Sequence, residues 1–236
     1  MITLEKVNER TFQIVTRMNL SPEQNKFVAP NIVSLAQAWL YYDNARPLAI
    51  MEDGEPVGFM MLDWDEGERT LGLWRFMIAT DKQGNGRGRR AIEILISDAK
   101  SSGLFDMMRL DYVQGNDRAR ALYYSLGFRE NGDVEDGEII MTLPLNDSPK
   151  LGHLIADMDD CEEIAELVQA EKELGAKMPA WLSDIDGIKA LIGAERLIRL
   201  TLMGDTVGVA LKGEKEFLLA HEHSDRFGEA CSILEL

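Results

Sequence analysis

A glycine-rich turn between an apolar run and an amphipathic segment constrains the fold of this chain most strongly. Residues 76–100 read "FMIATDKQGNGRGRRAIEILISDAK", with Gly84, Gly86 and Gly88 at alternate positions. Because glycine lacks a Cβ, such a turn can adopt positive φ and bring its backbone amides against a ligand. The helix expected after it directs further free amides and its positive dipole end to the same place. The pattern predicts a strand, loop and helix of an α/β fold, with an anion at the loop.

Arginines surround the same loop. Arg87, Arg89 and Arg90 carry guanidinium groups, which pair with phosphate oxygens more strongly than neutral donors do. A diphosphate suits this arrangement best, and a plain solvated turn is the alternative interpretation of these residues alone. The loop lacks the Gly-Lys-Ser/Thr ending of a Walker loop, and its G-x-G-x-G spacing differs from the G-x-G-x-x-G of dinucleotide-binding folds. Neither nucleotide motif fits.

Apolar periodicity indicates a sheet flanked by helices. A hairpin is expected at 46–64, where the acidic turn "EDGEP" separates two apolar runs. Further strands are expected at 72–79, 107–113, from Phe128, and at 138–145. Helical spacing occurs at 11–20, 31–42, 90–103 and 116–128, with Ser21 as a helix cap and Pro22 at a first helical position. We expect an α/β (α+β) domain with a mixed central sheet and helices on both faces.

A turn-rich polar stretch divides the chain. It reads "PLNDSP" and spans residues 144–149. We therefore place a larger domain at 1–147 and a smaller α/β domain at 148–236.

The charge of the chain restricts its partners. It has 41 acidic and 25 basic side chains and a net charge of −16. This charge repels nucleic acid and anionic membranes and favours a cationic substrate. The alternative is that the acidity serves solubility alone. No apolar run approaches the roughly 20 residues that span a bilayer, and the start lacks a signal-peptide pattern. Cys161 and Cys231 form neither a disulfide framework nor a paired-cysteine metal site. We expect a cytoplasmic protein with no nucleic-acid or membrane partner.

Two motifs together carry a resemblance to a known family. "QGNGRG", which follows an apolar strand, is similar to the Q/R-x-x-G-x-G/A diphosphate loop of the GNAT acetyltransferases. Further on, "NDRARALYYSLGF" resembles that family's second signature, N-x-x-A-x-x-x-Y-x-x-L-G-F. The segments "FVAPNIVSLAQA" and "RFMI" are further similar to the spermine/spermidine acetyltransferase branch. The resemblance covers roughly residues 1–145 and implies a GNAT fold for the larger domain.

The resemblance implies acetyl-CoA as cosubstrate and suggests where it binds. The strand at 72–79 would diverge from the strand at 107–113, with the pantetheine arm in the gap. In the family a neutral amine attacks the thioester directly, and a backbone amide of the diverging strand stabilises the oxyanion. Tyr123 matches the residue that gives a proton to the departing thiolate. The residues implied in cofactor binding are Met77, Ile78, Gln83, Gly84, Asn85, Gly86, Arg87, Gly88, Arg89, Asn116 and Tyr123.

The general base and the acceptor site stay open at this point. Asp111 on the central strand, or water held by Asp63, Asp65 or Glu66, is a candidate for removing the proton of the amine. Acids beside the reacting amine would hold it protonated, so acids farther away suit the distal charges of a polyamine better. The candidate acceptor-binding residues are Glu23, Phe27, Val28, Asp63, Asp65 and Glu66.

The resemblance predicts an N-acetyltransferase that moves acetyl from acetyl-CoA to a primary amine, and its branch suggests a polyamine such as spermidine or spermine. Alternative acceptors are an amino acid, a peptide amino terminus and an aminoglycoside. A non-catalytic acyl-CoA sensor is an alternative of another class. The family also implies a homodimer.

The smaller domain repeats the expected element order of the amino-terminal half, and its "TVGVAL" resembles "PVGFMM". No glycine loop follows, so we interpret it as a degenerate half-copy that binds no CoA, with an unrelated small module as the alternative. His221 and His223 would share one face if "EFLLAHEH" formed a strand. No third ligand is evident nearby, and we expect no metal site.

Overall fold

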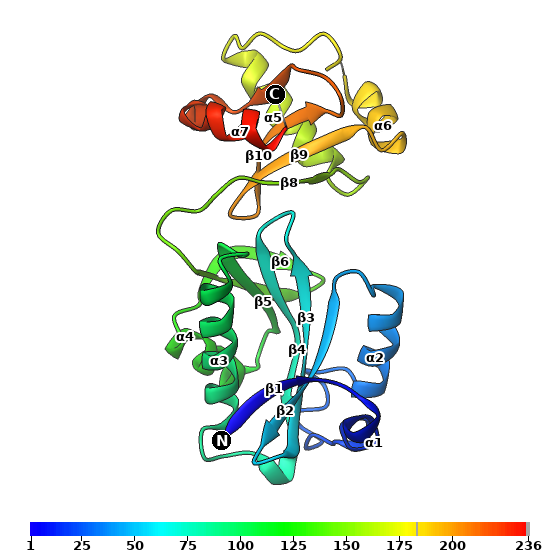
Figure 1. Cartoon of the computed structure of the whole chain (residues 1–236), viewed down its shortest axis with the longest axis vertical. Coiled ribbons are helices and arrows are strands. Elements are labelled where there is room, and N and C mark those ends of the chain that lie inside the picture. Colours follow the sequence, from blue (N-terminus) through cyan, green and yellow to red (C-terminus); the bar gives the residue numbers. More distant parts are fainter. Residues whose placement is uncertain (183, 235–236) are drawn as a thin grey trace. The chain divides into compact units, whose positions relative to one another are not determined.

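The computed structural model describes residues 1–182 and 184–234, which form two units (Figure 1). The first comprises Met1–Glu66 and Thr70–Asp147, and the second comprises Gly67–Arg69 and Ser148–Leu236. Each unit has its own sheet, of seven strands in the first and four in the second. None of the helices in the described part of the chain is long and apolar enough to cross a membrane.

The sheet of the first unit has the order β1-β2-β3-β4-β5-β7-β6. All neighbouring strands are antiparallel except β4 and β5, which are parallel. The strands are β1 Ile2–Lys6, β2 Ala45–Glu52, β3 Glu55–Asp65, β4 Thr70–Ile78, β5 Met107–Val113, β6 Arg129–Glu135 and β7 Glu138–Pro144. The helices are α1 Glu9–Arg17, α2 Asn31–Leu40, α3 Arg87–Ser102 and α4 Asp117–Ser125, with a 3-10 turn η1 at Thr80–Lys82.

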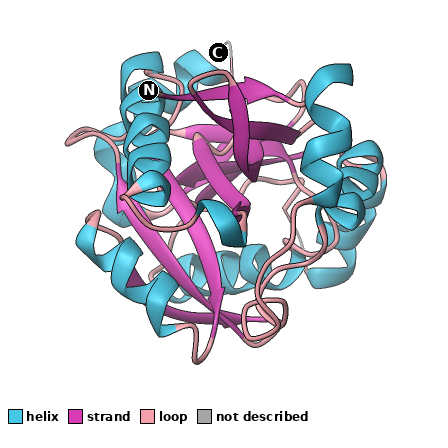
Figure 2. Cartoon of the chain, turned by 90° about the horizontal axis from the view of Figure 1, so that it is seen from below, coloured by secondary structure: helices cyan, strands magenta, loops and turns pink. Residues whose placement is uncertain are grey.

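Helices cover both faces of this sheet, as the sequence predicts (Figures 1 and 2). The apolar stripe of α3, with Ala91, Ile92 and Leu95, packs in one core with β-strand residues and with α4. Alternate residues of the strands face a second core, which Val15 of α1 and Leu35 of α2 complete. This alternation of side chains is what gives a mixed sheet two buried faces.

The parallel strands β4 and β5 pair only at their beginnings. Thr70 to Leu73 lie opposite Met107 to Leu110, and beyond these residues the two strands make no further pairs. A bulge in β4 inserts Trp74 between the residues that pair with Leu62 and Met61 of β3. Bulges increase the local bend of a strand. The divergence opens a gap between the carboxyl-terminal halves of the two strands.

One expectation for the segment between α1 and α2 is wrong. No helix begins at Pro22; Ser21 instead accepts bonds from the amides of Gln24 and Asn25 in a series of turns. The second helix starts after Pro30. Proline disfavours helical backbone in the residue that precedes it, so Pro30 separates these turns from α2.

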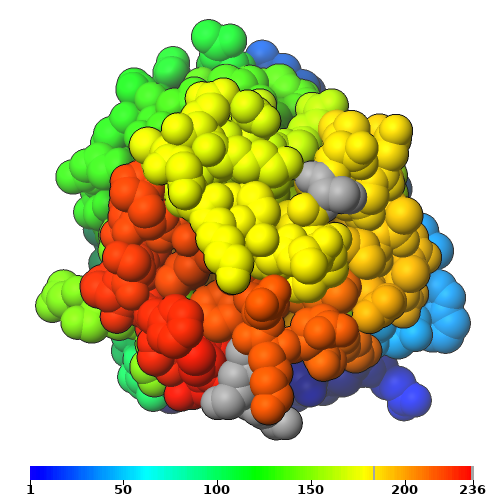
Figure 3. Space-filling model, turned by 90° about the horizontal axis from the view of Figure 1, so that it is seen from above, coloured from blue at the N-terminus to red at the C-terminus, as the bar shows by residue number. Residues whose placement is uncertain are grey.

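The second unit contains the sheet β11-β10-β9-β8, in which all neighbours are antiparallel. Figure 3 shows its surface, with the last helix in red beside yellow and orange segments. Its buried residues form two apolar clusters. Its elements are β8 Gly152–Ile155, α5 Cys161–Glu173, α6 Ile185–Gly193, β9 Leu197–Leu202, β10 Asp205–Leu211, β11 Phe217–Leu219, the 3-10 segment η2 His221–Arg226 and α7 Phe227–Ile233.

The second unit repeats the connectivity of the first half of the first unit. The order β8, α5, α6, β9, β10, β11 matches β1, α1, α2, β2, β3, β4, and the strands pair in the same sequence. Both central hairpins turn through two residues with positive φ, Asp53–Gly54 (52° and 86°) and Met203–Gly204 (58° and 94°).

Finer details of the two hairpins also correspond. The strand after each turn carries a register shift at a valine, followed by Gly58 or Gly208. A Cβ on these glycines would lie 2.5 and 2.6 Å from a carbonyl oxygen of the next strand. Ala79 and Ala220 donate their amides to the carbonyl of the shifted valine, at 3.0 and 2.8 Å. The correspondence supports the interpretation of the second unit as a half-copy.

Candidate active site

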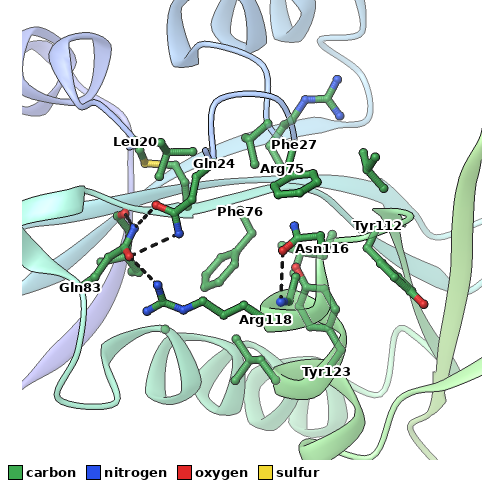
Figure 4. Close-up of a pocket in the computed structure, with 18 of the residues that line it drawn as sticks. Leu20, Gln24, Phe27, Arg75, Phe76, Gln83, Tyr112, Asn116, Arg118 and Tyr123 are labelled. Carbon is green, nitrogen blue, oxygen red and sulfur yellow. Dashed lines mark hydrogen bonds between the residues drawn. The ribbon is translucent and has the colours of Figure 1, made fainter. Parts of the chain in front are cut away.

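A cavity of about 680 Å³ opens where β4 and β5 diverge (Figure 4). Residues from both strands line it, together with α4, the glycine loop and the turns before α2. The predicted residues that line it are Met77, Ile78, Gln83, Gly84, Gly86, Arg87, Gly88, Arg89, Asp111, Asn116, Tyr123, Phe27 and Val28. The structure thus brings the two sequence motifs to one cleft.

The glycine loop presents unpaired backbone amides. Gly84, Asn85 and Gly86 all have positive φ, at 91°, 51° and 71°, so the chain coils tightly into α3. Arg87 donates its amide to the Gly84 carbonyl. Within the described part of the chain, no acceptor is bonded to the amides of Gly84, Asn85, Gly86, Gly88 and Arg89. Such a concave group of amides at the start of a long helix has the chemistry of a phosphate site.

Two details of the loop differ from the sequence interpretation. Gly88 does not adopt positive φ; it lies in the first turn of α3, where an added Cβ would contact Phe76 and Ile78 at 3.4 and 3.7 Å. These are ordinary van der Waals distances, so the packing of the helix on β4 does not require glycine at this position. The third left-handed residue is instead Asn85, which does not line the cavity. Asparagine tolerates this backbone region better than most residues.

Carboxylates already hold the loop arginines. Glu52 on β2 accepts from Arg87 Nε at 2.6 Å and from Arg90 Nη2 at 3.4 Å. Arg89 pairs with Glu93 at 3.4 Å and also donates to the Ser125 hydroxyl. These contacts fix the arginines around the loop and reduce the net positive charge they can offer an anion.

Gln83 joins the walls of the cleft (Figure 4). Its Nε2 donates to the Ile78 carbonyl at 3.0 Å and to Gln24 Oε1 at 2.9 Å. Its Oε1 accepts from Arg118 Nη1 at 2.9 Å. The side chain therefore connects β4, the turns before α2 and the first turn of α4.

Tyr123 is buried on α4 and its ring packs edge-on against Phe128. Its hydroxyl makes no hydrogen bond to any part of the chain that is described, and burial alone raises its pKa above the ordinary value. The phenol thus keeps its proton at neutral pH and can donate it into the cavity. Asn116 is the N-cap of α4, since its Oδ1 accepts from the Ala119 amide at 3.3 Å.

Acidic groups lie at the other end of the cavity. Asp111 of β5 and Glu138 of β7 both line it, and partial burial raises the pKa of each above its ordinary value. Their negative charges act on each other, which raises the pKa of Glu138 further. Arg75 of β4 lies near both, and its own pKa is lowered by burial. Arg109 donates to Asp111 at 3.5 Å and so opposes the rise in the pKa of Asp111.

The predicted acceptor acids do not reach the cavity wall. Glu23, Asp63, Asp65 and Glu66 are absent from its lining. The last three lie at the end of β3 near the β3–β4 turn, and Glu66 accepts from Trp64 Nε1 at 2.7 Å. Burial raises the pKa of Asp63, the charge of Asp65 raises it further, and Arg109 lowers it.

Sequence reasoning missed four residues of this arrangement: Gln24, Glu52, Arg118 and Glu138. Arg118 stands inside the second motif, two residues after Asn116, so helical spacing could have placed it at the cleft. Glu138 had no such signal, because only its pairing opposite Val113 brings it beside β5. Glu52 begins the acidic turn "EDGEP", and nothing in the sequence indicates its pairing with Arg87 and Arg90.

His221 and His223 lie in η2 and not in a strand, which ends at Leu219. His221 Nδ1 contacts Glu171 at 3.1 Å. Across the described residues, no group of three or more His, Cys, Asp or Glu side chains is placed to hold a metal ion.

Comparisons with known proteins agree with the fold. Residues 10–128, slightly more than half of the chain, match the model of the Acetyltransferase (GNAT) family. The spermine/spermidine N(1)-acetyltransferase of Bacillus subtilis (strain 168) is 26% identical over 153 residues, which cover 61% of this chain and 99% of that protein. The probable spermine N(1)-acetyltransferase of Bacillus subtilis subsp. natto gives the same identity and coverage.

Solved structures are similar over the same share of the chain. Spermidine N-acetyltransferase from Vibrio cholerae, in complex with CoA and spermine, has a TM-score of 0.52 at 16% identity, covering 61% of this chain and 95% of that one. Aminoglycoside acetyltransferase AAC(6')-Ib in complex with coenzyme A has a TM-score of 0.52 at 19% identity, with the same coverage. At these identities the similarity shows a shared fold.

Proposed function

The chain belongs to the acetyltransferase (GNAT) family, and from that premise we propose that it transfers an acetyl group from acetyl-CoA to a primary amine of a polyamine such as spermidine or spermine. One observation carries the proposal. A single cleft holds unpaired loop amides at one end, carboxylates at the other, and an unbonded buried phenol on α4.

The loop residues fit the cofactor. The amides of Gly84, Asn85, Gly86, Gly88 and Arg89 would donate to the oxygens of a diphosphate, since they have no other acceptor in the described chain. The edge of β4 that faces β5 pairs with no strand of the described chain beyond Leu73, and it can bond an extended arm near Met77 and Ile78. Acetyl-CoA, when bound, supplies a thioester carbonyl that an amine can attack directly. An amide on the same free edge of β4 can stabilise the negative oxygen that forms there.

Tyr123 is the proton donor of the proposal. Burial raises its pKa, so the hydroxyl stays protonated, and no protein acceptor competes for its proton in the described residues. The same removal from water raises the proton affinity of a thiolate that leaves beside it. Positioned donors of this kind contribute about 10²-fold or more to a rate.

The acidic end of the cleft provides the base. An alkyl amine with a pKa near 10 is about one part in a thousand neutral at pH 7, which costs roughly 4 kcal/mol. Asp111 lines the cavity with a raised pKa, which makes its carboxylate a better proton acceptor than an exposed one. It can remove the proton directly or through water.

The charge beyond this point supports a polycationic acceptor. Arg109 interacts with Asp111, Glu135 and Asp63, and Asp65 acts in turn on Asp63. These carboxylates outnumber the guanidinium groups, so a second ammonium group of the acceptor would be attracted there without holding the reacting amine protonated. Two relatives whose names include spermine acetyltransferase activity point the same way. An aminoglycoside also carries several ammonium groups and is the second candidate acceptor.

The test is release of coenzyme thiol from acetyl-CoA, measured with spermidine, lysine, a peptide and kanamycin. We expect turnover with spermidine and a kcat/KM at least about tenfold above that for lysine, since the third ammonium group of spermidine and its lack of a carboxylate would add about 1.4 kcal/mol or more of binding at the acidic end. Faster turnover with kanamycin than with spermidine would indicate an aminoglycoside, and not a polyamine, as the substrate. Binding of CoA with turnover on none of these amines would favour a non-catalytic acyl-CoA sensor and reject the proposal.

A further inference from the structure

Arg118 is a cation of the cavity wall that no carboxylate of the described residues neutralises. It lies on the first turn of α4, lines the cavity, and is exposed. Within the described chain it forms no ion pair, and its side chain donates to the neutral amide oxygen of Gln83 at 2.9 Å. The loop arginines, by contrast, are held by Glu52 and Glu93. A guanidinium has five donors, so most donors of Arg118 are left for a ligand.

The direction of this side chain places its charge near the loop amides. In Figure 4 it reaches from α4 across the cleft, under Phe76, to Gln83. Gln83 directly precedes Gly84, where the run of free amides begins. The guanidinium therefore lies close to the start of the run of amides that would bind a diphosphate.

The bond that holds Arg118 is weaker than the one a phosphate would offer. An amide oxygen is a neutral acceptor, whereas a phosphate oxygen carries charge and forms hydrogen bonds about twice as strong. Gln83 would not be left without partners, because its side chain also bonds Ile78 and Gln24. Exchange of Gln83 for a phosphate is thus favourable for Arg118 and leaves no buried group unsatisfied.

We infer that Arg118 is a phosphate-binding residue of the cofactor site, which leaves Gln83 and closes from α4 onto a phosphate of the bound coenzyme. The inference rests on the proposed function, since it concerns the same cleft. It gives Arg118 the pairing role that the sequence pattern suggested for Arg87. Arg87, held by Glu52, instead fixes the shape of the loop.

The test is calorimetric binding of coenzyme A, dephospho-coenzyme A and pantetheine to wild type and to Arg118→Gln, Arg118→Lys and Arg120→Gln. Arg120 is the matched control, because it lies on the same helix, pairs with Glu130 at 2.9 Å and does not line the cavity. Arg118→Gln should raise the Kd of coenzyme A about tenfold or more, from loss of a charge-assisted bond. Arg118→Lys should recover part of this, and Arg120→Gln should change the Kd less than about twofold.

Pantetheine separates phosphate binding from a general effect on the cleft. Its Kd should be the same for wild type and Arg118→Gln, because it carries no phosphate. A penalty that persists with dephospho-coenzyme A assigns Arg118 to the diphosphate, and one that disappears assigns it to the 3′-phosphate; either result supports the inference. Higher salt should weaken wild type more than Arg118→Gln.

Two results would overturn the inference and leave the proposed function standing. One is an unchanged Kd of coenzyme A in Arg118→Gln, and the other is an equal loss for coenzyme A and pantetheine. Failure of the wild-type protein to bind coenzyme A at all would reject both. Equal thermal unfolding midpoints of Arg118→Gln and wild type will show that the variant is folded.

Discussion

Removal of the Tyr123 hydroxyl should separate catalysis from binding and from folding. The phenol has no hydrogen-bond partner in the described chain, so Tyr123→Phe leaves no protein donor or acceptor unsatisfied. The ring keeps its edge-on contact with Phe128. We therefore expect the same fold and a free energy of unfolding that changes by less than about 1 kcal/mol.

The expected loss is in the chemical step. General-acid catalysis contributes about 10²-fold or more, so kcat should fall at least 100-fold, which is about 2.7 kcal/mol of transition-state stabilisation. The Kd of coenzyme A should change by less than about twofold, since the phosphate contacts remain. The raised pKa also fixes a pH dependence: the neutral phenol stabilises the fold fully below pH 10, and this stability is lost as pH rises toward the pKa of the folded state.

Thiol release under saturating amine measures kcat, and calorimetry measures the Kd. Tyr124→Phe is the matched control, because Tyr124 is the next residue of α4, packs against Arg120 and Arg129, and does not line the cavity. It should retain kcat within about threefold. If Tyr123→Phe keeps wild-type kcat, Tyr123 is a packing residue and the assignment of the proton donor is wrong.

Two further variants test the acidic end of the cleft and the packing of the sheet. Asp111 has a raised pKa, so its ionisation destabilises the fold as pH rises above about 4. Asp111→Asn should therefore unfold at a higher temperature at pH 7, while its kcat/KM falls about tenfold or more. An unchanged pH profile of kcat/KM would exclude Asp111 as the base. Gly58→Ala should lower the free energy of unfolding in urea by about 3 kcal/mol or more, since the added Cβ would lie 2.5 Å from the Met77 carbonyl oxygen. Gly193→Ala, with no atom within 4 Å of the new Cβ, should change it by less than about 1 kcal/mol, and equal effects would contradict the steric explanation.

The sequence predicts the fold of the first unit, and which motif residues line the cleft apart from Asn85, for physical reasons that act locally. Helix periodicity, turn glycines and strand patterns depend on near neighbours, and Gly103 ends α3 at φ 65° as its position suggests. The functional groups of the glycine loop lie within a few residues of one another in the sequence, and so do those of the second motif. Their meeting at one cleft follows from a fold that the two motifs together indicate.

The acceptor end could not be predicted in this way. Asp111, Glu138 and Arg75 come from three strands, and only the pairing of β5 with β7 and the bulge in β4 bring them together. The acids Asp63 and Glu66 have the right charge but lie toward the β3–β4 turn. Charge type is visible in a sequence, whereas the register that decides which charges meet is not.

The repetition within the chain separates the part of the fold that recurs from the part that completes the cleft. The second unit keeps the four-stranded half and closes two apolar cores with it, so this half recurs as a building block with its own buried residues. In the first unit the cleft lies at the seam between that building block and the residues from α3 to β7. The cleft therefore depends on both sides of this seam, and not on the recurring half alone.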